Sequence, residues 1–270
     1  MMKRLLITGA AGGLGKVARH RLAHMAEVLR LSDIADLGPV GLGEEAMTCD
    51  LGDAQAVNDL VKGCDGIVHF GGISVEDCFS KVSNANILGV YNLYEAARRN
   101  GNPRIFFASS NHTVGFYPQN RKLDAGSTFR PDGLYGVSKC FGEAMALMYH
   151  DKFGIETARV RIGSCFDKPA GRRMLATWLS RDDLVSLIEC VFRVPRLGCP
   201  VIYGVSANDC CWWDNSAVSY IGWVPKDNAE IYRAEVEAAE SVLASDNPAA
   251  VYQGGAFATD PIIEEDANGK

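Results

Sequence analysis

TGAAGGLGK, residues 8–16, is the stretch of the sequence that decides the fold. It follows the apolar run LLIT (residues 5–8), precedes a segment with helical periodicity, and spaces Gly9, Gly12 and Gly15 three residues apart. Glycine in such a turn lets the backbone approach a phosphate, and the N-terminus of the following helix presents free amides and the positive end of its dipole. The stretch therefore predicts a strand, a phosphate-binding turn and a helix, with a ligand-free glycine turn as the alternative.

Short apolar runs recur along the chain and alternate with helical segments. The predicted strands after the first are VLRLS (28–32), AMTCD (46–50), GIVHF (66–70), RIFFAS (104–109), TARVRIG (157–163) and CPVIYGV (199–205). Between them, DAQAVNDLVKG begins at Asp53, a residue type favoured at helix N-caps, and the longest predicted helix covers residues 134–153. Strands that alternate with helices predict an α/β fold with one parallel sheet and helices on both of its faces.

After residue 163 the alternation is less regular. A polar stretch is followed by a predicted helix near 182–192, a Trp-rich turn and an acidic helix near 228–245, and no linker separates this part from the rest. We therefore predict a doubly wound, Rossmann-type core over residues 1–163 and a small C-terminal substrate lobe over residues 164–270 that packs on it. The polar tail, residues 264–270, is expected to be mobile.

The composition excludes several kinds of partner. Of 270 residues, 47% are hydrophobic and 22% are charged, which is typical of a soluble globular protein with a large core. A formal net charge of -6 argues against nucleic acid and anionic membranes, although one well-placed Arg suffices to bind a small anion. The N-terminus, MMKRLLITGAAGG, has too few apolar residues for a signal peptide or a membrane span, so we expect a cytoplasmic protein.

The nine cysteines show no pattern of a metal or redox site. No two of them have the CxxC spacing of zinc-binding or redox-active pairs, so we predict reduced, mostly buried thiols and no bound metal. Cys165, just after the sixth predicted strand, has no activating neighbour in the sequence and is interpreted as an inert thiol.

An acidic residue follows the second predicted strand at the position that a dinucleotide site requires. Asp33 lies eighteen residues after Gly15, where a carboxylate bonds the hydroxyls of the adenine ribose. A carboxylate there repels a 2′-phosphate, and SDIADLG contains no Arg, so NAD is predicted rather than NADP. A solvated turn residue is the alternative for Asp33. Asp50, at the end of the third predicted strand, is open between an adenine contact and a helix cap.

LYGVSK places Tyr135 and Lys139 four residues apart, on one side of the longest predicted helix. A phenol has an ordinary pKa of about 10, and a nearby ammonium stabilises the phenolate and lowers this pKa. Such a tyrosine can accept the proton of an alcohol while a hydride leaves the carbon. Ser110, in the hydroxyl-rich strand end ASSNHTVGFYP (108–118), could bond the same oxygen, because ligands of parallel sheets bind beyond the carboxyl ends of the strands. A chance spacing of the two residues is the alternative.

These features give the sequence a resemblance to the extended, epimerase-like branch of the short-chain dehydrogenase/reductase superfamily. The residues that carry it are TGAAGGLG (8–15), HFGG (69–72), NILGVYNLYEAA (86–97), SSN (109–111), YGVSK (135–139) and GWVPKDN (222–228). Within that branch the sequence is similar to uronate dehydrogenases in GGISVE (71–76), ASSNHTVGFYP, RPDGLYGVSKCFGE (130–143), VRIGSC (160–165), RRMLATW (172–178), SANDCCWWDN (206–215) and QGGAF (253–257). The resemblance covers nearly the whole chain.

The resemblance implies NAD-dependent oxidation of a hexuronate, glucuronate or galacturonate, at C1 to the aldarolactone, with a Tyr base. It implies catalytic roles for Tyr135, Lys139 and Ser110, and substrate contacts for Ser74, Asn111, His112, Arg173, Ser164 and Phe257. The cofactor contacts that it implies are Gly9, Gly12, Gly13, Leu14, Gly15, Asp33, Ile34, Asp50, Leu51, Phe70, Gly71, Gly72, Asn86, Tyr135, Lys139 and Ile162.

Other interpretations stay open. His112 could simply hold its loop together, and Arg173, whose planar fork suits a carboxylate, could be a surface ion-pair residue with Arg172 as the ligand instead. The alternative functions are a nucleotide-sugar epimerase or another carbohydrate dehydrogenase of the same superfamily, and a non-catalytic NAD-binding protein. The preference between the two uronates and the effect of loop 165–173 are also open. A homo-oligomer that pairs through the helices near Asn86 and Leu134 is an expectation from the family.

Overall fold

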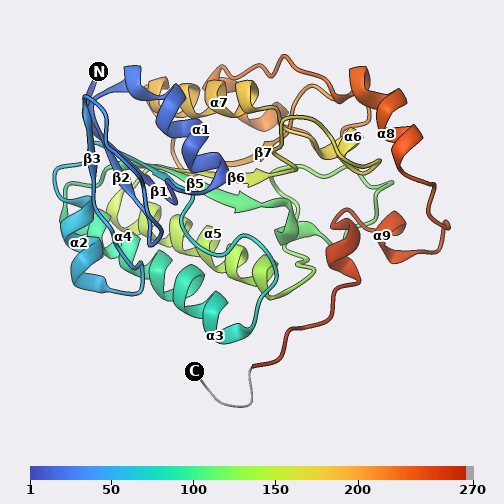
Figure 1. The fold of residues 1–270 in the computed structure, drawn as a ribbon, viewed down its shortest axis with the longest axis horizontal. Helices are drawn as coiled ribbons and strands as arrows, with labels where there is room; N and C mark the ends of the chain where they lie inside the picture. The colour runs from blue at the N-terminus through green and yellow to red at the C-terminus, as the bar shows by residue number, and fades with distance from the viewer. Residues whose placement is uncertain (266–270) are drawn as a thin grey trace.

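The centre of the molecule is one parallel β-sheet. In the computed structural model, which describes residues 1–265, seven strands form it in the order β3-β2-β1-β4-β5-β6-β7 (Figure 1). They are β1 (Met2–Thr8), β2 (Ala26–Ser32), β3 (Glu44–Ala46), β4 (Gly66–His69), β5 (Arg104–Ser110), β6 (Thr157–Ile162) and β7 (Val201–Gly204). The chain order reverses at β1, which pairs with β2 on one side and with β4 on the other. Such a reversal leaves a crevice beyond the carboxyl ends of the strands, where open α/β sheets bind ligands.

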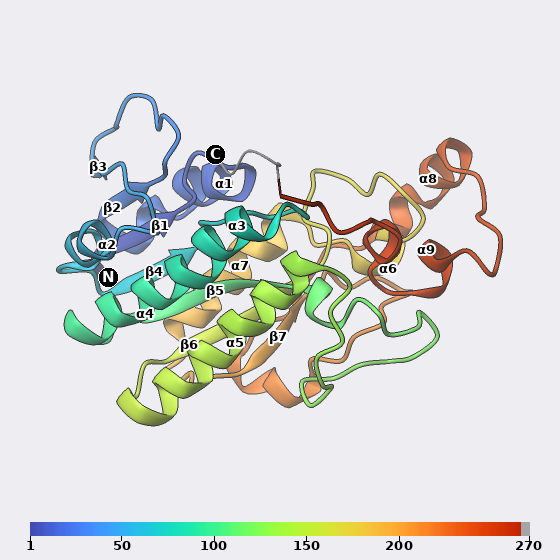
Figure 2. The same cartoon turned by 90° about the horizontal axis from the view of Figure 1, so that it is seen from below.

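Helices cover both faces of this sheet, as Figures 1 and 2 show. One face carries α1 (Gly13–Arg21) and α7 (Arg181–Arg193), and the other carries α2 (Ala54–Val61), α4 (Gly89–Arg99) and α5 (Leu134–Phe153). The short α3 (Phe79–Val82) and a π-helical turn (Ser83–Leu88) lead into α4. The predicted α/β class, a doubly wound parallel sheet, is confirmed.

A lobe of small helices lies beyond the carboxyl ends of the strands (Figure 1). It contains α6 (Met174–Thr177), α8 (Arg233–Ala239), α9 (Pro248–Val251) and the 3₁₀ helices η5 (Ala229–Tyr232) and η6 (Gly255–Ala258). The other 3₁₀ helices of the described chain are η1 (Ala23–Met25), η3 (Asn111–Val114) and η4 (Ser216–Ile221). Because α7 and β7 belong to the core, the lobe is smaller than the predicted residues 164–270, and the chain after residue 163 builds both parts.

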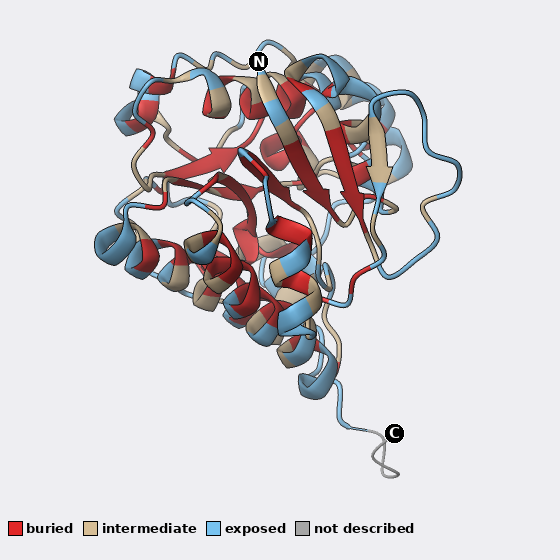
Figure 3. Ribbon diagram, turned by 90° about the vertical axis from the view of Figure 1, so that its left-hand side faces the viewer, coloured by how far each residue is buried: buried red, intermediate tan, exposed pale blue. Residues whose placement is uncertain are grey.

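The hydrophobic core has two layers, one on each face of the sheet. Leu5 and Ile7 of β1 pack in the layer under α1 and α7, whereas Leu6 packs in the layer under α2, α4 and α5. Figure 3 shows the consequence: the strands are buried along most of their length and the outer faces of the helices are exposed. Strands that are buried on both faces have nearly continuous apolar sequences, which is why the pattern of the sequence reveals them.

Two predicted helices are confirmed in detail. The Asp53 side chain caps α2, because its carboxylate accepts hydrogen bonds from the backbone N–H groups of Gln55 (2.9 Å) and Ala56 (3.0 Å). The long helix α5 covers the predicted residues 134–153 and ends at Gly154, whose φ of +73° gives the left-handed C-cap that glycine favours.

Two other elements differ in extent from the prediction. The third strand ends at Ala46 instead of continuing to Asp50, although Met47 and Cys49 still donate backbone hydrogen bonds to Leu31 and Asp33. This segment follows the edge of the sheet without forming a regular strand. The acidic helix expected over residues 228–245 is split into η5 and α8 and ends at Ala239.

The end of the described chain lies against α3. The Glu265 carboxylate accepts hydrogen bonds from the backbone N–H and the hydroxyl of Ser80, both at 2.6 Å. Of the tail predicted to be mobile, residues 266–270 lie outside the described residues.

Candidate active site

A cavity of about 1530 Å³ lies at the carboxyl ends of the strands, between the sheet and the lobe. Its wall is built by the β1–α1 turn, the segments that leave β2, β4, β5 and β6, the start of α5, and the lobe. The structure brings together every residue with a predicted role except Asn86. The lining includes Gly9, Gly12, Gly13, Leu14, Gly15, Asp33, Ile34, Asp50, Leu51, Phe70, Gly71, Gly72, Ser74, Ser110, Asn111, His112, Tyr135, Lys139, Ile162, Ser164, Arg173 and Phe257.

Two crowded glycines shape the turn between β1 and α1. Gly9 has a φ of +68°, and a Cβ there would lie 2.7 Å from the carbonyl carbon of Phe70. A Cβ on Gly15 would lie 2.0 Å from the carbonyl oxygen of Gly9, so only glycine fits at either position. No side chain caps the N-terminus of α1, and its first turn contains no acidic residue. The amides of this terminus can therefore bind a phosphate, and the turn fits a dinucleotide.

Asp33 connects this turn to the end of β2. Its carboxylate accepts hydrogen bonds from the backbone N–H groups of Ala11 (2.9 Å) and Ala35 (3.1 Å). A carboxylate has about four acceptor positions, so capacity remains for ribose hydroxyls. Of the two interpretations of Asp50, the helix cap is excluded, because Asp53 caps α2. The Asp50 carboxylate accepts from the Gly52 N–H (2.8 Å) at the edge of the cavity.

Asn86 lies behind the wall of the cavity and not in it. Its amide nitrogen donates to the Ile73 carbonyl and to the Ser138 hydroxyl, both at 2.9 Å, and its amide oxygen accepts from the Ile73 N–H at 2.8 Å. The π-helical turn directs this side chain inward, where its polar atoms are engaged by the protein. Asn86 therefore supports the loop after β4 through its side chain, and its predicted contact with the cofactor stays a prediction.

Ser110, Tyr135 and Lys139 meet at one end of the cavity. The Lys139 ammonium donates to the Ala108 carbonyl (2.8 Å) and lies 5.7 Å from the centroid of the Tyr135 ring. Burial raises the pKa of the Tyr135 phenol to about 12, while its hydrogen bond with the Ser110 hydroxyl acts in the opposite direction. Burial also lowers the pKa of Lys139 to about 8. We expected the Lys139 ammonium to lower the pKa of the Tyr135 phenol. In the protein without a bound cofactor, burial instead raises this pKa.

Glu76 fixes the start of the helix that carries Tyr135, a role that the sequence analysis did not predict. Its carboxylate oxygens accept hydrogen bonds from the backbone N–H groups of Leu134 (2.8 Å) and Tyr135 (3.0 Å). The N-cap residue itself, Gly133, has no side chain to do this. A helix without a capping residue needs a partner for its first amides, and that missing partner is the signal available in the sequence.

Arg173 is half-buried, and its guanidinium makes hydrogen bonds to three other residues. Its Nε donates to the Gln253 carbonyl (2.6 Å) and its Nη1 to the Ser164 hydroxyl (3.3 Å). With the Asn111 amide oriented to satisfy its neighbours, the amide oxygen accepts from the Arg173 Nη2 at 2.7 Å. A guanidinium has five N–H groups, so one on each Nη stays available. Free N–H groups on both terminal nitrogens are what a guanidinium needs to bind a carboxylate through two hydrogen bonds. Burial lowers the pKa of Arg173 to about 10, which leaves it charged at neutral pH.

Arg172, the alternative ligand for a carboxylate, is engaged by residues of the lobe. Its Nε donates to the Glu240 carbonyl (2.9 Å) and its Nη1 pairs with the Glu237 carboxylate (3.4 Å). The backbone N–H of Arg172 also donates to the Glu240 carboxylate. Of the two neighbouring arginines, Arg173 therefore offers the free donors and Arg172 anchors the end of α8.

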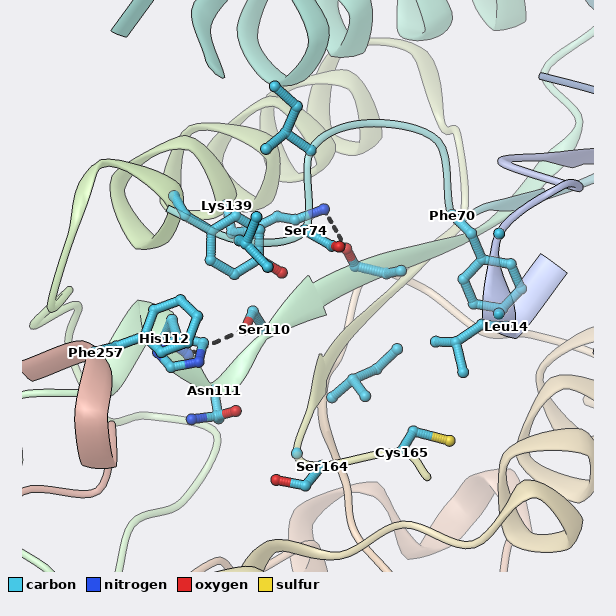
Figure 4. A pocket seen from close by; sticks show the side chains of 18 of the residues that line it. Leu14, Phe70, Ser74, Ser110, Asn111, His112, Lys139, Ser164, Cys165 and Phe257 are labelled. Atoms are coloured by element: carbon cyan, nitrogen blue, oxygen red, sulfur yellow. Dashed lines mark hydrogen bonds between the residues drawn. The ribbon is translucent and has the colours of Figure 1, made fainter. Parts of the chain in front are cut away.

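The hydroxyl-rich strand end predicted from the sequence forms one corner of the cavity. Figure 4 shows Ser110, Asn111 and His112 at the end of β5, with Ser74 on one side and Phe257 of η6 against His112. The His112 ring stacks on Phe257 with 3.9 Å between ring centroids, and it meets the Tyr135 ring edge-on at 5.8 Å. Leu14 and Phe70 border the opposite end of the view, toward the glycine-rich turn (Figure 4).

Cys165 also lines the cavity. Burial raises the pKa of the Cys165 thiol to about 12, which agrees with an inert residue. Each of the nine cysteines is a free thiol. Across residues 1–265, no three His, Cys, Asp or Glu side chains are grouped so that they could hold a metal ion. None of the helices in that same range is long and apolar enough to span a membrane.

Comparison with known proteins defines the class of protein. The NAD dependent epimerase/dehydratase family matches residues 5–181. The chain therefore belongs to the NAD dependent epimerase/dehydratase family. The predicted superfamily and the predicted cofactor, NAD, are thereby confirmed.

Relatives at high identity are uronate dehydrogenases. One from Agrobacterium fabrum is 60% identical over 264 residues, which cover 98% of this chain and 100% of the relative. Another, from Pseudomonas putida, is 56% identical over 256 residues and covers 94% and 95% of the two chains.

Solved structures agree with this result. A mutant uronate dehydrogenase from Agrobacterium tumefaciens, complexed with NAD, is 59% identical and superimposes with a TM-score of 0.96, covering 98% of this chain and 100% of that one. Glucuronic acid dehydrogenase from Chromohalobacter salexigens is 55% identical, with a TM-score of 0.96 and coverage of 97% and 98%.

Proposed function

We propose that the protein oxidises a hexuronate, such as glucuronate or galacturonate, at its anomeric carbon with NAD as hydride acceptor. The observation that carries this proposal is Arg173, a half-buried cation with two N–H groups that no described residue accepts, in the same cavity as Ser110 and Tyr135. A guanidinium with free donors in such a place favours a substrate with a carboxylate. The high identity to uronate dehydrogenases over nearly the whole chain supports the same substrate class.

The cofactor half of the cavity has the groups that NAD requires. The N-terminus of α1 would hold the pyrophosphate, and Asp33 would hold the adenine ribose and repel a 2′-phosphate. Phe70, Gly71 and Ile162 line the cavity between this turn and the catalytic residues. When bound, NAD supplies the hydride acceptor and a positively charged ring.

The other half of the cavity holds the sugar acid. Arg173 binds the carboxylate with two parallel hydrogen bonds, and Ser110 and Tyr135 bind the anomeric hydroxyl. Ser74, Asn111, His112 and Ser164 offer donors and acceptors that match the remaining hydroxyls.

Tyr135 acts as the base. It takes the proton of the anomeric hydroxyl as the hydride leaves C1, so that the hemiacetal carbon becomes the carbonyl carbon of a ring ester. The sugar ring stays closed, and the product is an aldarolactone. Ser110 and Lys139 both favour the phenolate, Ser110 by a hydrogen bond and Lys139 by its charge, against the burial that raises the pKa of Tyr135.

The test is the formation of NADH by the purified protein with NAD and one of four substrates: glucuronate, galacturonate, glucose or a nucleotide sugar. The proposal expects NADH with the uronates and little with the others. Interconversion of the nucleotide sugar without net NADH would instead identify an epimerase. A protein that binds NAD and transforms none of the four would be a binding protein, and either result would contradict the proposal.

We further infer that two copies of the chain pair through α4 and α5. These neighbouring helices and the turn before them expose Leu88, Tyr91, Val137, Leu147 and Met148. Apolar side chains on adjacent helices are typical of helix-mediated dimers. Sedimentation of the wild type and of a Tyr91→Glu variant tests this inference, since the charge is expected to shift the protein toward the monomer.

We also infer a cytoplasmic location. Nine free thiols, most of them buried or half-buried, suit a reducing compartment, where disulfides are rare. Fractionation of cells that express the protein tests this inference.

A further inference from the structure

Asp132 is a buried carboxylate behind His112 of the cavity wall, and the sequence analysis did not single it out. It lies in the loop before α5, and its side chain is fully buried. One oxygen, Oδ2, is 2.8 Å from Nδ1 of His112. The other, Oδ1, has no hydrogen-bond partner within the part of the chain that the structure describes. Burying a carboxylate with an unsatisfied oxygen is costly, so this position needs a physical reason.

Two glycines from separate loops make room for this carboxylate. A Cβ on Gly115 would lie 1.9 Å from Oδ2 of Asp132, and a Cβ on Gly254 would lie 1.7 Å from the same atom. The backbone N–H of Gly254 donates to the Gly115 carbonyl at 2.8 Å, which joins the two loops around Asp132. Three segments, distant in sequence, are therefore arranged so that one carboxylate reaches His112.

The His112 ring is fixed in orientation. Phe257 stacks on one side of it, and the Tyr135 ring packs edge-on against it. An ionised carboxylate only accepts hydrogen bonds, so the Asp132 contact places the proton of a neutral His112 on Nδ1. The other nitrogen, Nε2, then carries a lone pair. Because His112 lines the cavity, Nε2 is the ring nitrogen available to a ligand.

We propose that Asp132 is a positioning residue that holds His112 as the Nδ1–H tautomer, so that Nε2 accepts a hydrogen bond from a hydroxyl of the sugar acid. The inference rests on the proposed function, because it assigns the contact to that substrate. The contact exists before and during hydride transfer, so its loss weakens substrate binding and leaves the chemical step nearly unchanged. The contact through His112 therefore contributes to the KM for the uronate and not to kcat.

Asp132 has a second effect, which the experiment must separate from its effect on His112. Its negative charge also favours the charged form of Arg173 and opposes the ionisation of Tyr135. Removal of this charge changes both groups whether or not His112 is present. The contribution that passes through His112 is therefore measured as a coupling between the two positions.

The experiment compares the wild type, Asp132→Asn, His112→Ala and the double variant, with KM for uronate, KM for NAD and kcat measured for each. We expect Asp132→Asn to raise the uronate KM about tenfold in the presence of His112, as for the loss of one hydrogen bond, and less than about twofold in the His112→Ala background. The KM for NAD should stay the same within about twofold in all four proteins. Equal effects of Asp132→Asn in both backgrounds would overturn the proposal.

Asp124→Asn is the matched control. Asp124 lies in the same loop, where its carboxylate accepts from the Gly126 N–H (3.0 Å) and the Ser127 hydroxyl (3.1 Å), and it does not line the cavity. The same chemical change there is expected to leave the uronate KM unchanged. An increase as large as that of Asp132→Asn would show that the loop as a whole, and not the dyad, controls binding, and would overturn the proposal.

A measurement on the unaltered protein keeps the inference testable if Asp132→Asn does not fold. Nitrogen-15 NMR of the imidazole rings distinguishes the two tautomers, and the His112 signals are identified as those missing from the His112→Ala spectrum. We expect a protonated Nδ1 and an unprotonated Nε2. A proton on Nε2 at neutral pH would overturn the proposal. If the wild type forms no NADH with uronates, the proposed function fails, while the NMR result still decides the tautomer.

Discussion

Tyr135 and Lys139 lie in a part of the cavity where burial disfavours the charged form of both groups. It raises the pKa of the phenol to about 12 and lowers that of the ammonium to about 8. The Ser110 hydrogen bond and the positive charge of oxidised NAD both favour the phenolate, and the Lys139 ammonium, 5.7 Å from the ring, acts in the same direction. In the proposed mechanism, the Lys139 ammonium is thus one of three contributions that favour the phenolate of Tyr135.

In the proposed function, Arg173 decides which sugars bind. Replacement by Ala removes a charge-assisted bidentate contact worth about 1.5–3 kcal/mol, so the KM for uronate should rise roughly ten- to a hundredfold, and neutral hexoses should become better competitors. Arg172→Ala serves as the control, because that side chain is engaged by Glu237 and Glu240. Steady-state kinetics with a uronate and with the matching hexose provide the measurement. An unchanged KM in the Arg173 variant would mean that the carboxylate binds elsewhere.

At the scale of elements, the loop that carries Ser74 and Glu76 is connected to the start of α5, the helix that carries Tyr135. Glu76, in the loop that also carries Ser74, replaces the missing N-cap of this helix. Glu76→Ala should lower the free energy of unfolding by about 0.5–2 kcal/mol and should also reduce kcat, because Tyr135 loses its fixed position. Asp53→Ala is the matched control: it removes the cap of α2, which lies away from the cavity. The Asp53→Ala control should lose stability and keep the kcat of the wild type. Equal kcat values in the two variants would argue against a role for Glu76 in catalysis.

The turn between β1 and α1 determines which cofactor binds. Asp33 pins this turn and presents its carboxylate to the ribose site, so Asp33→Ala should raise the ratio of kcat/KM for NADP to that for NAD. The removed hydrogen bond to Ala11 should weaken NAD binding as well. Kinetics with both cofactors at saturating uronate measure the ratio. A variant that still discriminates against NADP as strongly as the wild type would show that another group selects the cofactor.

Local spacing accounts for the parts of the site that could be predicted. The glycine turn, Asp33 and the Tyr135–Lys139 pair are each encoded within a few residues or by the regular distance from one strand to the next. Glu76 and Asp132 could not be found in this way, because their partners Tyr135 and His112 are 59 and 20 residues away. The inward orientation of Asn86 depends on a π-helical turn, for which the sequence gives no reliable signal.

At the scale of the whole molecule, His69 in the buried centre of the sheet makes the stability of the fold depend on pH. This residue ends β4 in the centre of the sheet, where its Nδ1 lies 2.7 Å from the Thr8 hydroxyl of β1 and its ring stacks against Phe107. Its Nε2 has no partner among residues 1–265. Burial first, and the Lys139 charge second, lower the pKa of His69 to about 3. The native fold therefore requires a neutral imidazole.

The free energy of unfolding should fall at acidic pH because of His69. Between about pH 6.5 and pH 3 the unfolded chain binds a proton at His69 that the native protein does not, so stability falls as the pH falls. From pH about 7.5 to about 5.5 the free energy of unfolding should drop by about 1.4 kcal/mol more in the wild type than in His69→Asn. Urea unfolding at the two pH values measures this difference. His24→Asn, at an exposed histidine, should behave as the wild type. Identical pH dependence in the His69 variant would contradict the assignment.

The proposed mechanism requires that Tyr135 removes the proton of a uronate hydroxyl during hydride transfer to NAD. The rate of NADH formation from saturating uronate by Tyr135→Phe, together with the affinity of this variant for NAD, tests this role. We expect a loss of about a hundred- to ten-thousandfold in kcat, with NAD bound nearly as tightly as in the wild type. A Phe variant that oxidises uronates at a rate close to that of the wild type would contradict it.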